Sequence, residues 1–385
     1  MQRSMRHLLR GSSVLFAAAL VATACGGDDS SSESTTTTAA AAQGGDGSTT
    51  TAAQSTTTEA AEEDVELAEA TLNASGATFP KAFYDEAIIE FADLQPNITI
   101  NYAGGGSGKG RTDLQEQQVD FAGSDGLVKD EDRPNYKGGE FLYFPTVAAP
   151  ITVSFNLDGV DELQLSADTI AKIFQAEITS WDDAAIKADN PDADLPATPI
   201  TVARRSDGSG TTENFTKFLV SAAPDTWKLK SGSTVEWPAN TQGAQGNAGV
   251  AALIQATNGA IGYVDFSDAK ATGLAFASIK NKAGKFVEPS LEATSAALDT
   301  AEVNDDLSYN PINAPGEDAY PIAAPTWILV YKNQTDKAKG EATKAFLEYI
   351  LTDGQALAPD IDYAPLPDGL DEKALAQLDE IVIPS

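Results

Sequence analysis

The character of the sequence changes near residue 70, and only the longer part after that point has the composition of a folded protein. Residues 26 to about 70 are almost all Gly, Ser, Thr, Ala, Asp and Glu, without a Lys, Arg or aromatic residue. A segment of this kind buries too little apolar surface to offset the entropy that it loses on ordering. We therefore expect residues 25–70 to be a disordered acidic tether, with the fold in residues 71–385.

The first 24 residues have the pattern of a secretory signal peptide. Arginines within the first ten residues precede an apolar run from Val14 to Ala22, which is shorter than the roughly 20 residues of a membrane span. Cys25, the only cysteine, follows small residues at the end of this run, as in bacterial lipoproteins. We expect residues 1–24 to be cleaved and Cys25 to carry lipid, which would anchor the protein on the extracytoplasmic face of the cell membrane. A free thiol beside an ordinary cleavage site is the alternative.

Charge and residue usage exclude several classes of function. The chain has 25 Lys and Arg against 57 Asp and Glu, a net charge of −32, so no basic surface for nucleic acid is expected. The only histidine, His7, lies in the expected signal peptide, which argues against Ser-His-Asp or Cys-His catalysis and against His- or Cys-ligated zinc. We expect no enzyme activity, no cofactor and no metal. An anionic ligand would have to be captured by local dipoles and a few fixed cations.

Alternating strand-like and helix-like segments predict an α/β fold. The helix expected over 80–94, for example, places Phe83, Ala87, Ile88 and Phe91 on one face. Further strands are expected at 69–75, 98–102, 119–122, 200–204 and 260–266, and further helices near 112–118, 166–174, 181–187, 211–221, 248–257 and 337–351.

The part after the tether exceeds the length at which one hydrophobic core usually stops growing, so two domains are expected. Two apolar stretches broken by prolines, Leu142–Phe155 and Tyr320–Tyr331, are expected to cross between them. Domain I then comprises 71–148 with 322–385, and domain II comprises 149–321. Two crossing segments form a two-strand hinge, which suits closure around a ligand in the cleft between the domains.

Three loops combine glycine with a hydroxyl side chain, and each joins an expected strand to an expected helix. They are Gly76-Ala77-Thr78-Phe79, Gly106-Ser107-Gly108 and Gly208-Ser209-Gly210-Thr211. A helix N-terminus presents free N–H groups and the positive end of its dipole, glycine allows close approach and hydroxyls add donors, so the loops together predict an anion site. Taken singly, each loop could be no more than a helix N-cap. The glycine cluster matches neither a P-loop nor a dinucleotide-binding motif.

A charged pair precedes the third loop. Arg205 stands just before Gly208, and a guanidinium matches the oxygens of phosphate bidentately. Asp207, two residues further on, would hold that guanidinium rigid. The alternative is a solvated surface pair.

Asp125 is a carboxylate that follows the strand expected at 119–122, where an anion is expected nearby. Its presence is reasonable if the ligand carries a hydrogen, because hydrogen phosphate can donate its O–H to Asp125 whereas sulfate has no proton to give at neutral pH. A site built on such a bond can reject the analogue that lacks it by ~10⁴–10⁵. The alternative is a turn-forming Asp before Gly126.

These segments, in order, resemble the PstS family, the phosphate-binding subunits of bacterial high-affinity phosphate ABC transporters. The resemblance covers nearly all of Thr71 to about Pro367, and its most specific part is the Arg-Arg-x-Asp-Gly-Ser-Gly-Thr block at 204–211. The other matching stretches are 75–80, 119–125, 144–147, 181–186, 232–238, 260–264 and 316–322.

The resemblance implies a role for each candidate residue. It implies that Asp125 accepts the ligand's proton and that Arg205 makes the charged contact, held in place by Asp207. The residues implied to donate hydrogen bonds to phosphate are Thr78, Phe79, Ser107, Ser209, Gly210 and Thr211. The resemblance also implies a two-domain periplasmic-binding-protein-like fold of type II with phosphate in the interdomain cleft.

The function that follows from the resemblance is capture of inorganic phosphate and its delivery to the membrane permease subunits of an ABC transporter, by a monomer. The alternatives are a receptor for another oxyanion such as sulfate, arsenate or molybdate, a secreted phosphatase, and a surface adhesin. One departure from the family pattern stands after Ser107, where Lys109 and Arg111 replace small uncharged residues. A cation close to the cleft could alter affinity or add salt dependence, but it does not disturb Ser107 itself.

Overall fold

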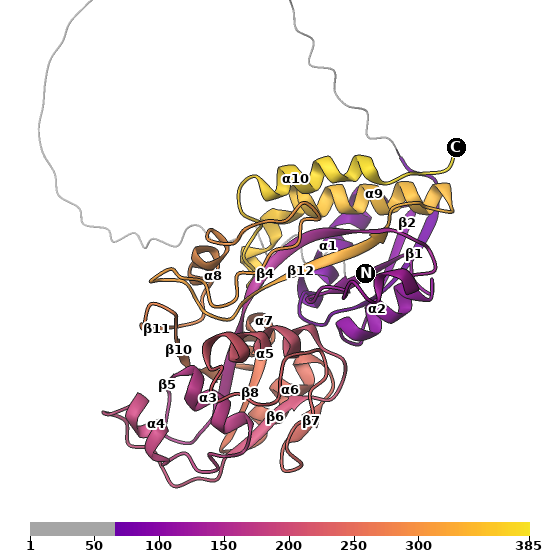
Figure 1. Ribbon diagram of the computed structural model, residues 1–385. Helices are drawn as coiled ribbons and strands as arrows, with labels where there is room; N and C mark the ends of the chain where they lie inside the picture. The colour runs from indigo at the N-terminus through magenta and orange to yellow at the C-terminus, as the bar shows by residue number, and fades with distance from the viewer. Residues whose placement is uncertain (1–65) are drawn as a thin grey trace, which may run out of the picture. The chain divides into compact units, whose positions relative to one another are not determined.

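The computed structural model describes residues 66–385, which fall in one unit of the chain (Figure 1). The expected signal peptide, Cys25 and residues 25–65 of the expected tether lie outside the described residues. Within 66–385 no helix is both long enough and apolar enough to cross a bilayer.

A single mixed sheet runs through the unit in the order β2-β1-β3-β12-β4-β8-β6-β7, with β9 beside β4. Its strands are β1 (Ala70–Gly76), β2 (Ile98–Gly104), β3 (Phe121–Ser124), β4 (Phe141–Asn156), β6 (Thr201–Arg205), β7 (Gln242–Ala244), β8 (Ala260–Asp265), β9 (Ala275–Phe276) and β12 (Ala323–Tyr331). A smaller sheet has the order β11 (Phe286–Val287), β10 (Ser278–Lys280) and β5 (Gln164–Leu165).

Strand β4 divides the large sheet into two halves. Residues 141–150 of β4 pair antiparallel with β12, and residues 151–156 pair antiparallel with β8. We call β2, β1, β3, β12 and residues 141–150 the first half-sheet, and residues 151–156 with β8, β6, β7 and β9 the second half-sheet. Figure 1 shows β4 running from the elements around the first half-sheet to the elements around the second half-sheet.

The prolines of the crossing segments are accommodated without ending the strands. Pro145 and Pro150 both lie inside β4, which is 16 residues long and buried except at Asn156. Next to Pro145, which faces Trp327, the register shifts between Pro325 and Trp327 of β12, and Pro150 lies where β4 stops pairing with β12 and begins pairing with β8. Since proline has no N–H to give to a ladder, it is tolerated in a strand where pairing is irregular. The apolar stretch expected to cross is therefore one continuous strand.

Helices cover both half-sheets. They are α1 (Lys81–Leu94), α2 (Ser107–Gln115), α3 (Ala167–Phe174), α4 (Ala184–Asp189), α5 (Gly210–Ala222), α6 (Gly246–Gln255), α7 (Phe266–Thr272), α8 (Leu291–Leu298), α9 (Lys337–Leu351) and α10 (Leu370–Gln377). Short 3₁₀ turns lie at Arg133–Asn135, Asp353–Leu357, Pro359–Ile361 and Leu378–Glu380. The seven helices expected from the sequence are all present, with α4 beginning three residues later than predicted, whereas α7, α8 and α10 were not predicted.

Helix α2 differs from the prediction, because it begins at Ser107 rather than near residue 112. Its first turns consist of the glycine cluster, which has low helix propensity. The glycines serve close packing. A Cβ added to Gly110 would lie 2.6 Å from Gly76 Cα, and one added to Gly108 would lie 3.1 Å from Gly208 Cα. The helix can approach the strand ends this closely only because those positions lack side chains.

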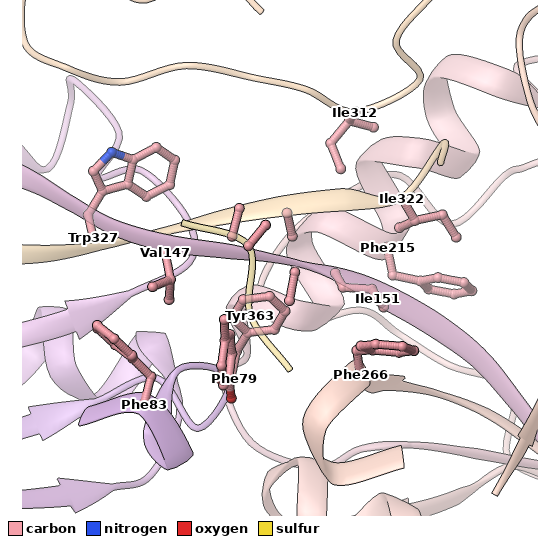
Figure 2. Packing of buried hydrophobic residues seen from close by; sticks show 14 of the residues in the cluster. Phe79, Phe83, Val147, Ile151, Phe215, Phe266, Ile312, Ile322, Trp327 and Tyr363 are labelled. Atoms are coloured by element: carbon pink, nitrogen blue, oxygen red, sulfur yellow. The ribbon is translucent and has the colours of Figure 1, made fainter. Parts of the chain in front are cut away.

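Aromatic packing fixes the first loop. Phe79 is fully buried, and its ring lies edge-on to that of Tyr363 with centroids 6.2 Å apart (Figure 2). The Tyr363 hydroxyl donates to the Phe79 carbonyl at 2.6 Å. Phe83 of α1 packs on the same tyrosine ring. The Phe79 backbone is thereby held on a rigid element rather than on a free loop.

Candidate functional site

Strand ends from both half-sheets face one another at the site. Strand β1 runs parallel to β2 and β3, so the loops that follow these strands gather at one edge of the first half-sheet. Strand β6 runs parallel to β7 and β8 in the second. Crevices at the carboxyl ends of parallel strands are the usual ligand sites of open α/β sheets.

The second and third glycine loops touch across the two half-sheets. The Gly108 N–H donates to the Gly208 carbonyl at 2.9 Å. A Cβ added to Gly210 would lie 2.5 Å from Ser107 Oγ and 2.7 Å from Asp125 Oδ2. The first turn of α5 therefore reaches into contact with Ser107 and Asp125, which belong to the other half-sheet.

Arg205 is a buried cation held in a fixed orientation. Its side chain is 1% exposed. Its Nε donates to Asp207 Oδ1 at 2.8 Å, and its Nη2 pairs with Asp207 Oδ2. Its Nη1 is 3.4 Å from Thr211 Oγ1. Burial raises the pKa of Asp207, but the hydrogen bond and charge of Arg205 outweigh it, so the pKa of this carboxyl lies below its ordinary value. The pair is buried and bidentate rather than a solvated surface pair.

Asp125 is also buried, with 2% exposure. Thr326 Oγ1 donates to its Oδ1 at 2.8 Å and Ser107 Oγ donates to its Oδ2 at 3.2 Å. Desolvation raises the pKa of Asp125 to about 7, although these two hydrogen bonds and the charge of Arg205 oppose the shift. The carboxyl of Asp125 therefore changes charge near neutral pH, which a turn-forming surface Asp would not do.

Free N–H groups supply most of the donors. Ser107 opens α2, while Gly210 and Thr211 open α5, and the first N–H groups of a helix have no acceptor inside it. Ser209 is more committed than expected, because its N–H donates to Ser233 O at 2.9 Å and its Oγ accepts from Thr212 N–H at 3.1 Å. Only its hydroxyl hydrogen remains for a ligand.

Asn247 also lies at the site, although it was not among the residues expected from the sequence. This residue lies in the first turn of α6 and is fully buried. Its backbone N–H and its Nδ2 both lie 3.3 Å from Thr78 Oγ1, and Nδ2 lies 3.2 Å from Thr211 Oγ1. A detectable signal was present, since Gly246 and Asn247 repeat the arrangement of strand, glycine, polar residue and helix seen in the three loops.

Lys109 and Arg111 have different partners. Lys109 pairs with Asp113 on its own helix and is half exposed. Arg111 reaches from α2 to Glu213 of α5, with Nη1 3.3 Å from Oε2, and both side chains are largely buried. Glu213 also pairs with Lys217 at 2.9 Å. Of these two cations, therefore, only Arg111 forms an ion pair between the two half-sheets.

No cluster of three or more His, Cys, Asp or Glu able to hold a metal ion occurs within residues 66–385. The groups that converge are instead N–H donors, hydroxyls, one guanidinium and one carboxyl. Such a set matches a partly protonated oxyanion, which needs many donors and one acceptor.

The fold and the site together define a solute-binding protein of the periplasmic type. Residues 31–354 match the model of the PBP superfamily domain. A phosphate-binding protein from Stenotrophomonas maltophilia has the same fold, with a TM-score of 0.63 and 24% identity over 80% of this chain and 94% of that one. The expected α/β fold of type II is confirmed.

The family is defined by closer relatives. The phosphate-binding protein PstS of Pasteurella multocida is 35% identical over 316 residues, covering 80% of this chain and 89% of that protein. The protein of the same name from Methanocaldococcus jannaschii is 36% identical over 325 residues, covering 77% and 82%. The chain belongs to the PstS family, as its motifs indicated.

Proposed function

We propose that this protein captures inorganic phosphate outside the cell and delivers it to the permease of a phosphate ABC transporter. The observation that carries the proposal is the contact of Gly210 with Ser107 and Asp125. It brings the N-terminus of one helix, the start of another and a buried carboxyl around one position. Family membership supports the same ligand.

The site residues proposed for phosphate are those expected from the sequence, with Asp207 supporting Arg205. The donors are Thr78, Phe79, Ser107, Arg205, Ser209, Gly210 and Thr211. Asp125 shares one hydrogen with the ligand. Because its pKa is about 7, that hydrogen can reside on either partner near neutral pH. Sulfate brings no such hydrogen, so phosphate is favoured over sulfate.

Two domains are proposed to close around the ligand, domain I comprising 71–148 with 322–385 and domain II comprising 149–321. Their two-strand hinge lies where β4 and the start of β12 meet. There the Ile151 N–H donates to Ile322 O at 2.9 Å, and the Tyr320 hydroxyl donates to Ile151 O at 2.9 Å. These hydrogen bonds between the two crossing segments let the segments bend as one unit.

Arg111→Gln is expected to raise the phosphate dissociation rate about 3- to 10-fold and to leave the association rate nearly unchanged. The reason is that the ion pair with Glu213 forms only when the half-sheets are together. Glu213 would keep Lys217 as a partner, so the loss should be on the order of 1 kcal/mol. Stopped-flow measurement on the two proteins checks this. Lys109→Gln is the control, since Lys109 pairs within α2. Equal phosphate dissociation rates for wild type and Arg111→Gln would contradict a role of the Arg111–Glu213 ion pair in holding the site closed.

The protein is further proposed to act as a monomer held on the extracytoplasmic membrane face by lipid on Cys25, after loss of residues 1–24. No catalytic role is proposed, because the part after the expected signal peptide contains no histidine to act as a base. Its partners would be phosphate, the permease subunits and the membrane, with no nucleic acid.

Calorimetric titration with phosphate, sulfate, arsenate and molybdate tests the ligand. Phosphate should bind tightly, arsenate should compete because it also carries a hydrogen, and sulfate and molybdate should bind far more weakly than phosphate at pH 8. Heat from sulfate alone would reject phosphate as the ligand. Turnover of a chromogenic phosphate ester would reject the proposal that the protein is not an enzyme.

A further inference from the structure

Asn247 contacts hydroxyl groups of both half-sheets. Thr78 follows β1 of the first half-sheet, whereas Thr211 lies in α5 beside the second. The Asn247 amide nitrogen lies 3.3 Å from Thr78 Oγ1 and 3.2 Å from Thr211 Oγ1, so one side chain bridges the two. None of the sequence motifs assigned a role to this residue.

Each of these threonine hydroxyls has its acceptor capacity filled. A hydroxyl oxygen has two lone pairs and one hydrogen. Thr78 Oγ1 accepts from the backbone N–H and from Nδ2 of Asn247. Thr211 Oγ1 accepts from Asn247 Nδ2 and from Arg205 Nη1. In both cases the only bonding capacity left is the hydrogen, which requires an acceptor such as an anion oxygen.

We propose that Asn247 is a positioning residue that turns the hydroxyl hydrogens of Thr78 and Thr211 toward the bound oxyanion. Nδ2 can only donate, so it holds both threonine oxygens as acceptors and commits their hydrogens to the ligand. Because the two threonines belong to opposite half-sheets, the Asn247 amide also helps to hold the two half-sheets together when the site is closed. The inference rests on the proposed function, since it names a determinant of the same anion site.

The hydrogen bonding of Asn247 differs from that of an asparagine that stabilises the fold. Asn281 is also buried, but its Nδ2 donates to backbone carbonyls such as Ala319 O, and its Oδ1 accepts from Lys285 N–H. Asn247 Oδ1, by contrast, has no partner within the described residues. A buried polar atom without a partner is unfavourable. The amide therefore contributes through its nitrogen to the two hydroxyls rather than through a complete set of structural bonds.

Two substitutions at this position separate orientation from shape. Asn247→Ala frees both hydroxyls to rotate, and phosphate affinity should fall about 10-fold. Asn247→Asp keeps the shape but replaces the donor with an acceptor, so both hydroxyls should turn toward residue 247 and away from the anion. Its phosphate affinity should fall about 100-fold or more at pH 8, where the new carboxylate is charged. Calorimetric titration of the full-length protein with phosphate gives both values.

A double-substituted background tests the mechanism even if one variant folds poorly. In Thr78→Val with Thr211→Val, the hydroxyls are gone, and adding Asn247→Ala should change phosphate affinity less than twofold. Asn281→Ala is the matched control, expected to lower the unfolding temperature and to leave affinity unchanged. Sulfate and phosphate should weaken in proportion in Asn247→Ala, since both anions accept the same hydrogens.

The outcomes distinguish the inference from the proposed function. If the wild-type protein binds no phosphate, the proposed function is wrong. If wild type binds phosphate and Asn247→Asp binds it equally well, the positioning role is wrong. A further tenfold loss from Asn247→Ala in the valine background would also overturn it, because the effect would then not pass through the hydroxyls.

Discussion

Asp125→Asn is expected to narrow the preference for phosphate over sulfate by about 10³–10⁴ at pH 8.5. In the wild type the ionised carboxylate accepts the ligand's hydrogen and repels an anion that has none, and such a missing bond discriminates by up to ~10⁵. An asparagine amide can donate to either anion. Sulfate affinity should therefore rise far more than phosphate affinity falls. Titration of both proteins with both anions measures the ratio.

The pH dependence of sulfate binding provides an independent check of the role of Asp125. Burial raises the pKa of its carboxyl to about 7, so below that pH the group is neutral and can donate its own hydrogen to sulfate. The sulfate affinity of the wild type should therefore fall as the pH rises through 7. The phosphate affinity should change less, because a hydrogen is available for the bond between Asp125 and phosphate both below and above pH 7. In Asp125→Asn the sulfate affinity should lose this dependence.

Asp113→Asn is the control for this change. Asp113 is an acid on α2 that bonds Ser75 and Lys109 outside the anion site. Its substitution should leave the ratio of phosphate to sulfate affinity unchanged. If Asp125→Asn lowers the phosphate affinity and the sulfate affinity by the same factor, the carboxyl of Asp125 does not distinguish the anions by the ligand's hydrogen.

Gly210→Ala is expected to lower phosphate affinity by 10³ or more while leaving the unfolding temperature of the ligand-free protein within about 2 °C of wild type. A methyl group at this position would overlap Ser107 Oγ and Asp125 Oδ2, and both belong to the opposite half-sheet. This overlap should prevent the site from closing, because closely packed atoms cannot move apart by about half an ångström without a cost in free energy. In the proposed open form the two half-sheets stand apart, so the added methyl group would not meet these atoms. Calorimetry with phosphate and thermal unfolding test the two parts.

Gly249→Ala is the matched control, because it lies in α6 at the same edge of the second half-sheet. An added Cβ there would lie 3.5 Å from Ala244 Cβ, an ordinary contact distance. Alanine in a helix is favoured over glycine, so stability should rise slightly and phosphate affinity should not change. Normal phosphate binding by Gly210→Ala would show that the start of α5 does not approach Ser107 when the ligand is bound.

Periodic elements were predictable from the sequence, and elements defined by close approach were not. Helix α1 carries Phe83, Ala87 and Phe91 on one face, so its apolar spacing identified it. Helix α2 has few apolar residues and begins in the glycine cluster, so no periodic signal marked its first turn. Local propensity there disfavours a helix, and packing against Gly76 and Gly208 decides the outcome.

The site divides in the same way. Ser107, Asp125 and Arg205 stand in motifs with a chemical rationale, and each is buried in the place where loops converge. Asn247 repeats only the glycine and polar residue of those loops, and its bond to Thr78 joins residues 169 positions apart. The pairing of Arg111 with Glu213 spans 102 positions. Contacts at such separations depend on how the half-sheets meet, which local sequence patterns do not encode.

The position of β12 determines when the protein can complete its fold. This strand lies between β3 and β4 in the sheet, although more than 160 residues separate the end of β4 from its start. Until residues 323–331 emerge from the ribosome or the export channel, β3 and β4 have unpaired edges that face each other across a missing strand. Closing a chain loop of this length is slow, and exposed edges invite aggregation in the interval. For a chain exported before it folds, as the expected signal peptide implies for this one, such a delay would be an advantage.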